Sequence, residues 1–282
     1  MRATTTIAGV RAAVDEARRE GRRVALVPTM GALHQGHLSL VARAREEADL
    51  VVVSVFVNPL QFGPGEDFER YPRDPEGDAA AAGSAGADLV FAPDVRELYP
   101  REPRVSVVPL GLGDRWEGEV RPGHFAGVLT VVLKLLNIVR PDVAVFGQKD
   151  FQQAMIVRAM VEDLDVAVRI VVERTVREAD GLALSSRNRY LSGADRAQAP
   201  RLHQALAAAR AAFDGGERSA SQLVGVARRV LDAPPAITTD YLAVVDPATL
   251  EPREHAQDGD TALLAARLGS TRLIDNVLLG ER

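Results

Sequence analysis

The chain has 282 residues, enough for two domains of ordinary size. Its 39 acidic and 34 basic residues give a formal net charge of −5, and aromatic residues make up only 5%. These values argue against a basic nucleic-acid footprint and against a base-stacking platform. Cysteine is absent, which excludes disulfides, thiolate metal sites and a cysteine nucleophile.

The first part of the chain alternates helical and strand patterns. The spacing of Ile7, Val10, Val14 and Ala17 predicts a helix over 7–20. A strand is predicted at Val24–Val27, where it stops at Pro28, and a loop at Thr29–Gly36. A helix is predicted from His37, with Leu38, Val41, Ala42 and Ala48 on one face, and a strand at Leu50–Val57. Strand, loop, helix and strand in this order predict the βαβ unit of a parallel sheet.

The same pattern repeats up to about Val176. We expect helices at Asp74–Gly83, Phe125–Val139 and Phe151–Asp163, and strands at Leu89–Ala92, Val143–Phe146 and Val166–Val172. The fold class is therefore predicted to be α/β, with a Rossmann-like doubly wound parallel sheet over residues 1–176.

The pattern changes after Gly181. Helices are predicted at Ala194–Phe213 and Ser219–Leu231, and strands at Ile237–Val245, Thr261–Ala266 and Thr271–Leu278. This order indicates a smaller α+β domain over residues 177–282.

The ends and apolar runs of the chain bear on its location. The first 23 residues carry charges throughout and lack the apolar region of a secretory signal, and the longest apolar run is far too short to cross a bilayer. We expect a cytoplasmic protein with no membrane partner and no nucleic-acid partner.

The loop between the first two strands is the first candidate site. It contains Met30, Gly31, Ala32, Leu33, His34, Gln35, Gly36 and His37. Its glycines allow a close approach of the backbone to a ligand, and the following helix offers unpaired N–H groups to an anion. A capped helix with incidental histidines explains the loop equally well. The spacing of the two histidines does not match a zinc-protease motif, and we predict no metal ligands.

Three further polar clusters follow predicted strands or precede helices. Asn58 and Gln61 could hold a hydroxyl or carboxylate, but a simple Asn-Pro turn explains these two residues better when they are taken alone. Lys149 and Asp150 follow a strand, where Lys149 could bind phosphate while Asp150 could bind a ribose hydroxyl or cap the helix. Ser185, Ser186 and Arg187 form an anion-binding set, unless they belong to a solvated interdomain loop. Arg121 and His124 lie where the long helix begins, and a histidine there is more often a cap than a catalyst.

These clusters together resemble one family. Thr29–His37 resembles the His-x-Gly-His motif of the nucleotidylyltransferase superfamily. The strings Val57–Phe62, His124–Val128, Phe146–Asp150 and Ser185–Leu191, in that order and spacing, resemble the pantothenate synthetase (pantoate–β-alanine ligase) family over essentially the whole chain.

The resemblance implies a reaction and a set of roles. ATP, accompanied by Mg²⁺, would activate pantoate as pantoyl adenylate, and β-alanine would then displace AMP. His37, His34 and Lys149 would be catalytic at the phosphates. The ATP site would comprise residues 30–37 together with Gly147, Gln148, Lys149, Asp150, Val176, Leu184, Ser185, Ser186 and Arg187. Gln61, Gln153, Asn58, Arg121 and His124 would bind substrate. The domain over 1–176 would bind ATP and pantoate, the domain over 177–282 would act as a lid, and the enzyme would be a homodimer.

Two other functions remain open at this stage. A small-molecule nucleotidyltransferase of the same superfamily would keep the nucleotide on its product and release only pyrophosphate. A non-catalytic nucleotide-binding regulator would not need Lys149 and two histidines converging on phosphate.

Overall fold

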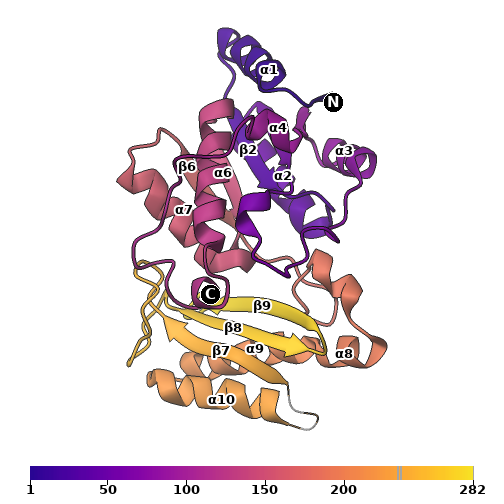
Figure 1. The fold of residues 1–282 in the computed structure, drawn as a ribbon. Helices are drawn as coiled ribbons and strands as arrows, with labels where there is room; N and C mark the ends of the chain where they lie inside the picture. The colour runs from indigo at the N-terminus through magenta and orange to yellow at the C-terminus, as the bar shows by residue number, and fades with distance from the viewer. Residues whose placement is uncertain (234, 236, 282) are drawn as a thin grey trace. The chain divides into compact units, whose positions relative to one another are not determined.

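The computed structural model of the chain describes residues 1–233, 235 and 237–281. It contains two compact units (Figure 1). The first unit comprises residues 1–147 and 153–174, and the second comprises residues 148–152 and 175–282. The short segment 148–152 therefore makes its contacts with the second unit although both of its chain neighbours belong to the first.

The first unit is built on a six-stranded parallel sheet in the order β1-β4-β3-β2-β5-β6. The strands are β1 (Arg2–Thr4), β2 (Val24–Thr29), β3 (Leu50–Val55), β4 (Leu89–Phe91), β5 (Val143–Gly147) and β6 (Arg169–Glu173). The chain runs outward from β2 through β3 to β4, then returns and continues on the other side of β2 through β5 and β6. This reversal confirms the predicted doubly wound sheet, and ligands in such sheets bind at the strand ends where the order reverses.

Helices cover both faces of this sheet. On one face α2 (Gln35–Glu47) packs against β2, β3 and β5, and α3 (Pro75–Ser84) packs against β3 and β4. Alternate strand residues such as Ala25, Val27, Val51 and Val53 fill the core beneath α2. Helices α1 (Ile7–Arg19) and α6 (His124–Val139) pack on β2 and on each other. The unit also contains α7 (Phe151–Asp163) from Gln153 onward and the short α4 (Val95–Leu98) and α5 (Glu117–Val120).

Several predicted boundaries in the first unit were wrong. Strand β2 continues past Pro28 to Thr29, because only β3 pairs with that end of β2 and the missing N–H of Pro28 interrupts no ladder with β5. Strand β6 begins at Arg169 rather than Val166, since Asp165 takes a left-handed conformation (φ +49°) and Val166 N–H bonds back to Val161, closing the end of α7. On α2, Ala42 is exposed, and Leu40 and Ala44 are buried with Val41 instead. The pairing of β1 with β4 was not predicted.

The second unit is a three-stranded antiparallel sheet packed against two helices. The strands β7 (Thr238–Val245), β8 (Thr261–Leu268) and β9 (Thr271–Leu278) form a meander in the order β7-β8-β9. Helices α9 (Pro200–Asp214) and α10 (Ala220–Asp232) cover one face, where Leu206, Leu223 and Leu264 are fully buried. The predicted smaller α+β fold is therefore confirmed.

The long helix predicted over Ala194–Phe213 is in fact two helices. Helix α8 (Gly193–Gln198) ends at Ala199, and α9 begins at Pro200. Proline lacks the N–H that would continue a helix, and it is well tolerated in the first turn, so Pro200 ends one helix and starts the next. Among the residues that the structure describes, no helix is both long enough and apolar enough to span a bilayer.

Candidate active site

The loop that follows β2 is held in a defined shape by hydrogen bonds that are buried or partly buried. The hydroxyl of Thr29 donates to the carbonyl of Ser54 (2.7 Å) and accepts from Gly31 N–H (3.2 Å). Gly31 has a φ of +83°, and a Cβ there would lie 2.6 Å from a carboxylate oxygen of Asp78. Glycine is therefore required at this position both by backbone conformation and by space.

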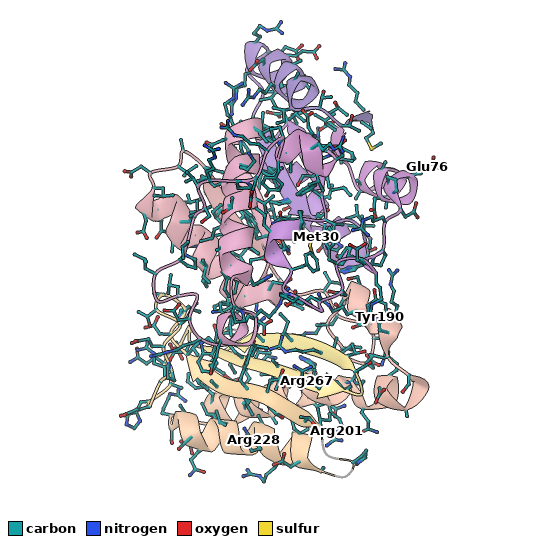
Figure 2. The ribbon with its side chains drawn as sticks, viewed as in Figure 1. Met30, Glu76, Tyr190, Arg201, Arg228 and Arg267 are labelled. Carbon is teal, nitrogen blue, oxygen red and sulfur yellow. The ribbon has the colours of Figure 1, made fainter. Side chains whose placement is uncertain are left out.

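Asp78 of α3 fixes the next two residues of the same loop. Its carboxylate accepts from Ala32 N–H (3.0 Å) and from Leu33 N–H (2.7 Å), and the residue is buried. Met30 precedes this segment (Figure 2). Asp78 was not among the predicted site residues, although helical spacing places it on the same face of α3 as the buried Ala82. That face was the available signal that this carboxylate points inward.

His34 and His37 form a reciprocal cap at the start of α2. His34 Nδ1 accepts from Gly36 N–H (3.2 Å), and His37 Nδ1 accepts from His34 N–H (3.3 Å). The helix thus begins at Gln35, two residues before the predicted start. Because both Nδ1 atoms accept hydrogen bonds, each neutral ring carries its proton on Nε2. The histidines therefore cap the helix and are also equipped to donate a hydrogen bond through Nε2.

A second group in the first unit centres on Asn58 and Gln61, which lie at the two ends of a short helical turn, η1 (Pro59–Gln61). Asn58 Oδ1 accepts from Leu60 N–H (3.3 Å) and from the Tyr99 hydroxyl (3.0 Å). Asn58 Nδ2 donates to the carbonyl of Gly127 and to Gln61 Oε1, both at 3.1 Å. Gln61 Nε2 lies 3.1 Å from the sulfur of Met30. The polar turn after β3 therefore reaches the loop that follows β2.

His124 and Arg121 hold the backbone of this group. His124 Nδ1 donates to the carbonyl of Gln61 (2.9 Å), and Arg121 Nη1 donates to His124 Nε2 (3.0 Å). Arg121 also pairs with both carboxylate oxygens of Glu66 at 2.8 and 2.7 Å. Burial raises the pKa of Glu66, but its hydrogen bonds and charge pairing with Arg121 outweigh burial and lower the pKa overall. The charge of Arg121 is thus balanced within the unit.

The second unit carries the remaining predicted ATP residues on two segments. Gln148, Lys149 and Asp150 form the short helix η2 (Gln148–Asp150), in which Lys149 Nζ lies 3.6 Å from Asp150 Oδ1. Residues 176–184 form a hairpin that was not predicted. Leu184 N–H bonds to the carbonyl of Val176 (3.0 Å), which brings these two residues side by side.

Ser185 caps the short helix η3 (Ser186–Tyr190) directly after that hairpin. Its hydroxyl accepts from Arg187 N–H at 3.2 Å. Asn188 donates to Glu178 (2.9 Å) and to the carbonyl of Ala183 (3.1 Å), which ties η3 back to the hairpin. The structure thus groups Val176 and Leu184 with Ser185, Ser186 and Arg187.

The predicted residues fall into three groups. Within the first unit, the loop 30–37 meets Gln61, and Asn58, Arg121 and His124 surround Gln61. Gly147 ends β5, and Gln153 lies partly buried in the first turn of α7. The second unit contains the groups at 148–150 and at 176–187. Sequence reasoning missed Asp78, Glu66 and Tyr99, which contact the predicted residues from distant parts of the chain.

The chain is similar to known proteins over almost its whole length. The family model for pantoate–β-alanine ligase matches residues 2–278. The chain belongs to the pantoate–β-alanine ligase family. It is an enzyme of this ligase family, as the sequence motifs predicted.

Relatives within this family match the chain over nearly its full length. The pantothenate synthetase of Acidothermus cellulolyticus is 57% identical over 258 residues, covering 90% of this chain and 84% of the relative. The crystal structure of the pantothenate synthetase from Thermus thermophilus matches with a TM-score of 0.93 and 50% identity, covering 99% of both chains. The crystal structure of the Francisella tularensis ligase, described as complexed with β-γ ATP and β-alanine, matches with a TM-score of 0.79 and 32% identity. It covers 99% of this chain and 97% of that one.

Removal of the Asp78 carboxylate is expected to destabilise the loop that follows β2. Asp78→Ala leaves the buried N–H groups of Ala32 and Leu33 without their acceptor, a change that costs about 2–3 kcal/mol in unfolding free energy. Urea denaturation measures this loss. Glu76→Ala, on the exposed side of the same helix (Figure 2), is the matched control and should change stability by less than about 0.5 kcal/mol. Equal effects of the two substitutions would contradict the assignment of Asp78.

His124 is expected to make the protein less stable in mild acid. Burial of the ring and the charge of Arg121 lower the pKa of His124 from 6.5 to about 4. Above pH 7 neither state binds a proton there. Between pH 6.5 and 4 the unfolded chain takes up the proton while the folded chain does not, so stability falls as the pH drops. The loss at pH 4 reaches about 3 kcal/mol.

Denaturation of wild type and His124→Asn across pH 4.5–7.5 tests this expectation. Asparagine keeps a donor near the position of Nδ1, and it does not titrate. The variant should therefore show a shallower decline of stability between pH 6.5 and 4.5. Parallel curves for the two proteins would show that His124 is not the group responsible.

Proposed function

We propose that the enzyme condenses pantoate with β-alanine to form pantothenate, using Mg-ATP and releasing AMP and pyrophosphate. The observation that carries this proposal is the full-length match to the family, which includes a relative whose structure is described as a complex with β-γ ATP and β-alanine. We further propose that the enzyme is cytoplasmic and acts as a homodimer. Analytical ultracentrifugation measures the number of subunits.

The first step activates the acid. A carboxylate oxygen of pantoate attacks the α-phosphorus of ATP, the bond between the α-phosphorus and its bridging oxygen breaks, and pyrophosphate leaves. In the second step the amine of β-alanine attacks the acyl carbon of pantoyl adenylate, and AMP leaves with the oxygen that pantoate contributed. No nucleophile of the protein takes part, so the residues act by alignment and by electrostatics.

The loop that follows β2 supplies hydrogen-bond donors for this chemistry. In our proposal residues 30–37 surround the nucleotide, and His34 and His37 donate to its phosphate oxygens through Nε2. The capping bonds to Nδ1 support this role because they fix the proton of each neutral ring on Nε2. His37 is the favoured donor to the leaving pyrophosphate.

We assign the positive charge at the phosphates to Lys149 and Arg187. Lys149 neutralises negative charge that builds on the phosphates as the five-coordinate state forms, and Ser185, Ser186 and Arg187 bind the triphosphate. Gly147, Gln148, Asp150, Val176 and Leu184 bind the adenosine part. The grouping of most of these residues on η2 and on the hairpin 176–184 supports a shared role in nucleotide binding.

We assign the binding of pantoate to the group of residues around Gln61. We assign pantoate to Gln61 and Gln153, with Asn58, Arg121 and His124 holding the shape of the pocket around Gln61. The hydrogen bond from His124 to the Gln61 carbonyl supports a role for His124 in holding Gln61 in place.

A product assay with labelled substrate tests the proposed reaction. The protein is incubated with Mg-ATP, β-alanine and pantoate that carries ¹⁸O in its carboxylate. We expect equal amounts of pantothenate, AMP and pyrophosphate, with one ¹⁸O atom in each AMP. ADP among the products would exclude the adenylate, and pyrophosphate without AMP would favour a nucleotidyltransferase that keeps the nucleotide on its product.

A further inference from the structure

Two adjacent positions of strand β9 carry buried polar side chains to which the proposed function gives no role. Asn276 and Asp275 are almost fully buried, at 1% and 4% exposure. They are neighbours on a strand, so their side chains point to opposite faces of the sheet. A buried amide and a buried carboxylate at adjacent positions need partners, and the partners identify what these residues do.

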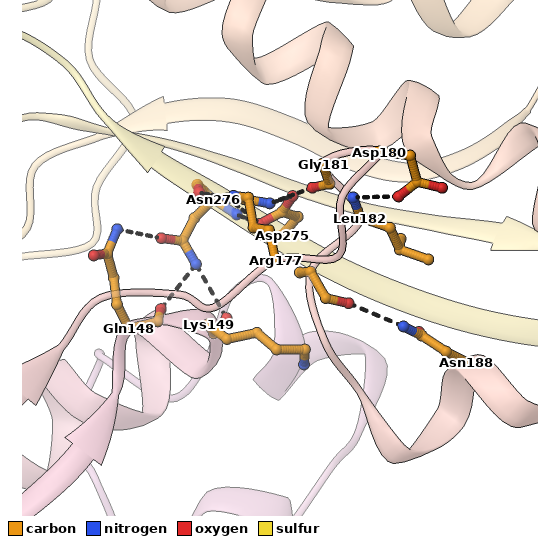
Figure 3. Close-up of polar contacts among 10 residues, drawn as sticks. Gln148, Lys149, Arg177, Asp180, Gly181, Leu182, Asn188, Asp275 and Asn276 are labelled. Atoms are coloured by element: carbon orange, nitrogen blue, oxygen red, sulfur yellow. Dashed lines mark hydrogen bonds and ion pairs between the residues drawn. The ribbon is translucent and has the colours of Figure 1, made fainter. Parts of the chain in front are cut away.

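Asn276 holds two consecutive backbone carbonyls, those of Gln148 and Lys149 (Figure 3). Its Nδ2 donates to the carbonyl of Gln148 (2.9 Å) and to that of Lys149 (3.0 Å), and its Oδ1 accepts from Gln148 Nε2 (3.1 Å). Both polar atoms of the amide are thus engaged with η2. One side chain, 127 residues further along the chain, fixes the segment from which the Lys149 side chain extends.

Asp275 and Arg177 anchor Asn276 and the hairpin 176–184 together. Arg177 pairs with both carboxylate oxygens of Asp275 at 2.6 and 2.9 Å, and donates to the carbonyls of Gly181 and Asn276, both at 3.2 Å. Asp275 also accepts from Asn276 N–H at 2.8 Å. The segment that carries Lys149 is therefore attached to Asn276 of β9 (Figure 3). The hairpin that precedes Ser185–Arg187 is attached through Arg177 to the neighbouring Asp275 and to the Asn276 carbonyl.

We propose that Asn276 is a positioning residue for Lys149 in the adenylation step. This inference rests on the proposed role of Lys149 at the phosphates. Lysine is a point charge on a long, flexible stem, so its effect on a developing charge depends on where its backbone is held. A shift of about 1 Å in a positioned group can lower turnover by about 10²-fold. In this proposal Asn276 acts through the peptide of Lys149 and not by contact with the reacting atoms.

The isosteric substitution Asn276→Asp tests this role. It keeps the shape of the side chain but removes both donors and turns an oxygen toward the carbonyls of Gln148 and Lys149. We expect kcat to fall by about 10–10²-fold. We expect the KM for pantoate to stay within about 2-fold, since the pantoate group lies in the first unit. If the aspartate variant does not fold, Asn276→Ser replaces it. Serine also breaks these hydrogen bonds but adds no negative charge, and the same fall in kcat is expected.

Two comparisons separate positioning from a general loss of structure. Asp240→Asn removes the ion pairs of Asp240 with Arg267 (Figure 2) and Arg272 at the other end of the same sheet, so it should lower Tm without lowering kcat. In a Lys149→Ala background, Asn276→Asp should reduce kcat by less than about 3-fold further, because the side chain that it positions is already gone.

The outcomes distinguish this inference from the proposal beneath it. Wild-type kcat in folded Asn276→Asp or Asn276→Ser, with Lys149→Ala impaired, would overturn the role of Asn276 alone. Effects that multiply in the double variant would overturn it as well. Wild-type kcat in Lys149→Ala would refute the role of Lys149 itself, and the inference about Asn276 would fall with it.

Discussion

Replacement of Lys149 by alanine is expected to lower kcat for pantothenate formation by about 10²–10³-fold, the loss typical of removing one preorganised electrostatic group. The charge on the phosphates grows as pyrophosphate departs, so the loss should appear in kcat more than in the KM for pantoate. Steady-state release of pyrophosphate measures both constants. Calorimetric titration with Mg-ATP, without pantoate, shows how much of the effect is already present in nucleotide binding.

The chain offers a matched control for this experiment. It contains only two lysines, Lys134 and Lys149, and every other basic residue apart from histidine is arginine. Lys134 lies on helix α6, and its Nζ is 5.5 Å from the centroid of the Tyr99 ring. Lys134→Ala should keep kcat within about 2-fold, because a partly exposed cation–π contact contributes about 0.5–1 kcal/mol to stability and takes no part in the reaction.

The variant Lys149→Arg tests whether a positive charge at this position is sufficient for the wild-type kcat. A guanidinium keeps the charge but spreads it over a planar fork, and it does not reach the same point as a compact ammonium. We expect kcat between those of Lys149→Ala and wild type. Full activity in Lys149→Ala, with Lys134→Ala also active, would remove Lys149 from the mechanism.

Loss of the His37 ring is the second large effect that we expect. His37→Ala should lower kcat by about 10²–10³-fold, since it removes the Nε2 donor that we propose for the phosphates. The same substitution also removes the acceptor for His34 N–H at the start of α2. Alanine therefore changes two functions of the ring, and additional variants are needed to separate them.

Asparagine and glutamine each place a polar group near one of the two nitrogens of the histidine ring. His37→Asn places an oxygen near the position of Nδ1, so it keeps the cap and loses the distant donor. His37→Gln keeps a donor near the position of Nε2 and loses the cap. We expect His37→Asn to match the wild-type Tm but to be as inactive as alanine, and His37→Gln to be less stable but more active. Activity that follows Tm across the three variants would show that His37 has only a capping role.

The elements of the fold could be predicted wherever one period of hydrophobic residues ran unbroken. The strand pattern of Leu50–Val55 and the helical pattern of α6 follow from local sequence, and their alternation fixes the doubly wound sheet. The errors lie where a single residue overrides the pattern. Pro200 divides an alanine-rich segment that has helical propensity throughout, and Pro28 is tolerated inside a strand because of which neighbour β2 has at that point.

The site was less predictable than the fold because its supports come from far along the chain. The histidine loop could be singled out from its own glycines and histidines, but its fixed shape depends on Asp78, about 45 residues away. The cap formed by His34 and His37 required atomic geometry, since capping and phosphate binding predict the same residues. The attachment of Lys149 to Asn276 joins positions that share no local pattern, and only the pairing of η2 with β9 shows it.

The amide network around Asn58 has a consequence for the kind of chemical group that could bind at Gln61 in the proposed substrate site. Leu60 N–H can only donate, and the Gly127 carbonyl can only accept, so the orientation of the Asn58 amide is fixed. Asn58 Nδ2 therefore faces Gln61 Oε1, and this contact in turn directs Gln61 Nε2 outward toward Met30.

Gln61 consequently presents hydrogens rather than lone pairs. A ligand atom that meets it must be an acceptor, as hydroxyl and carboxylate oxygens are, whereas an ammonium group would meet only like polarity. In the proposed substrate site the network would favour acceptor groups, because backbone groups orient Asn58 and Asn58 in turn orients Gln61. A Gln61→Glu substitution would reverse that preference while leaving the shape of the site almost unchanged.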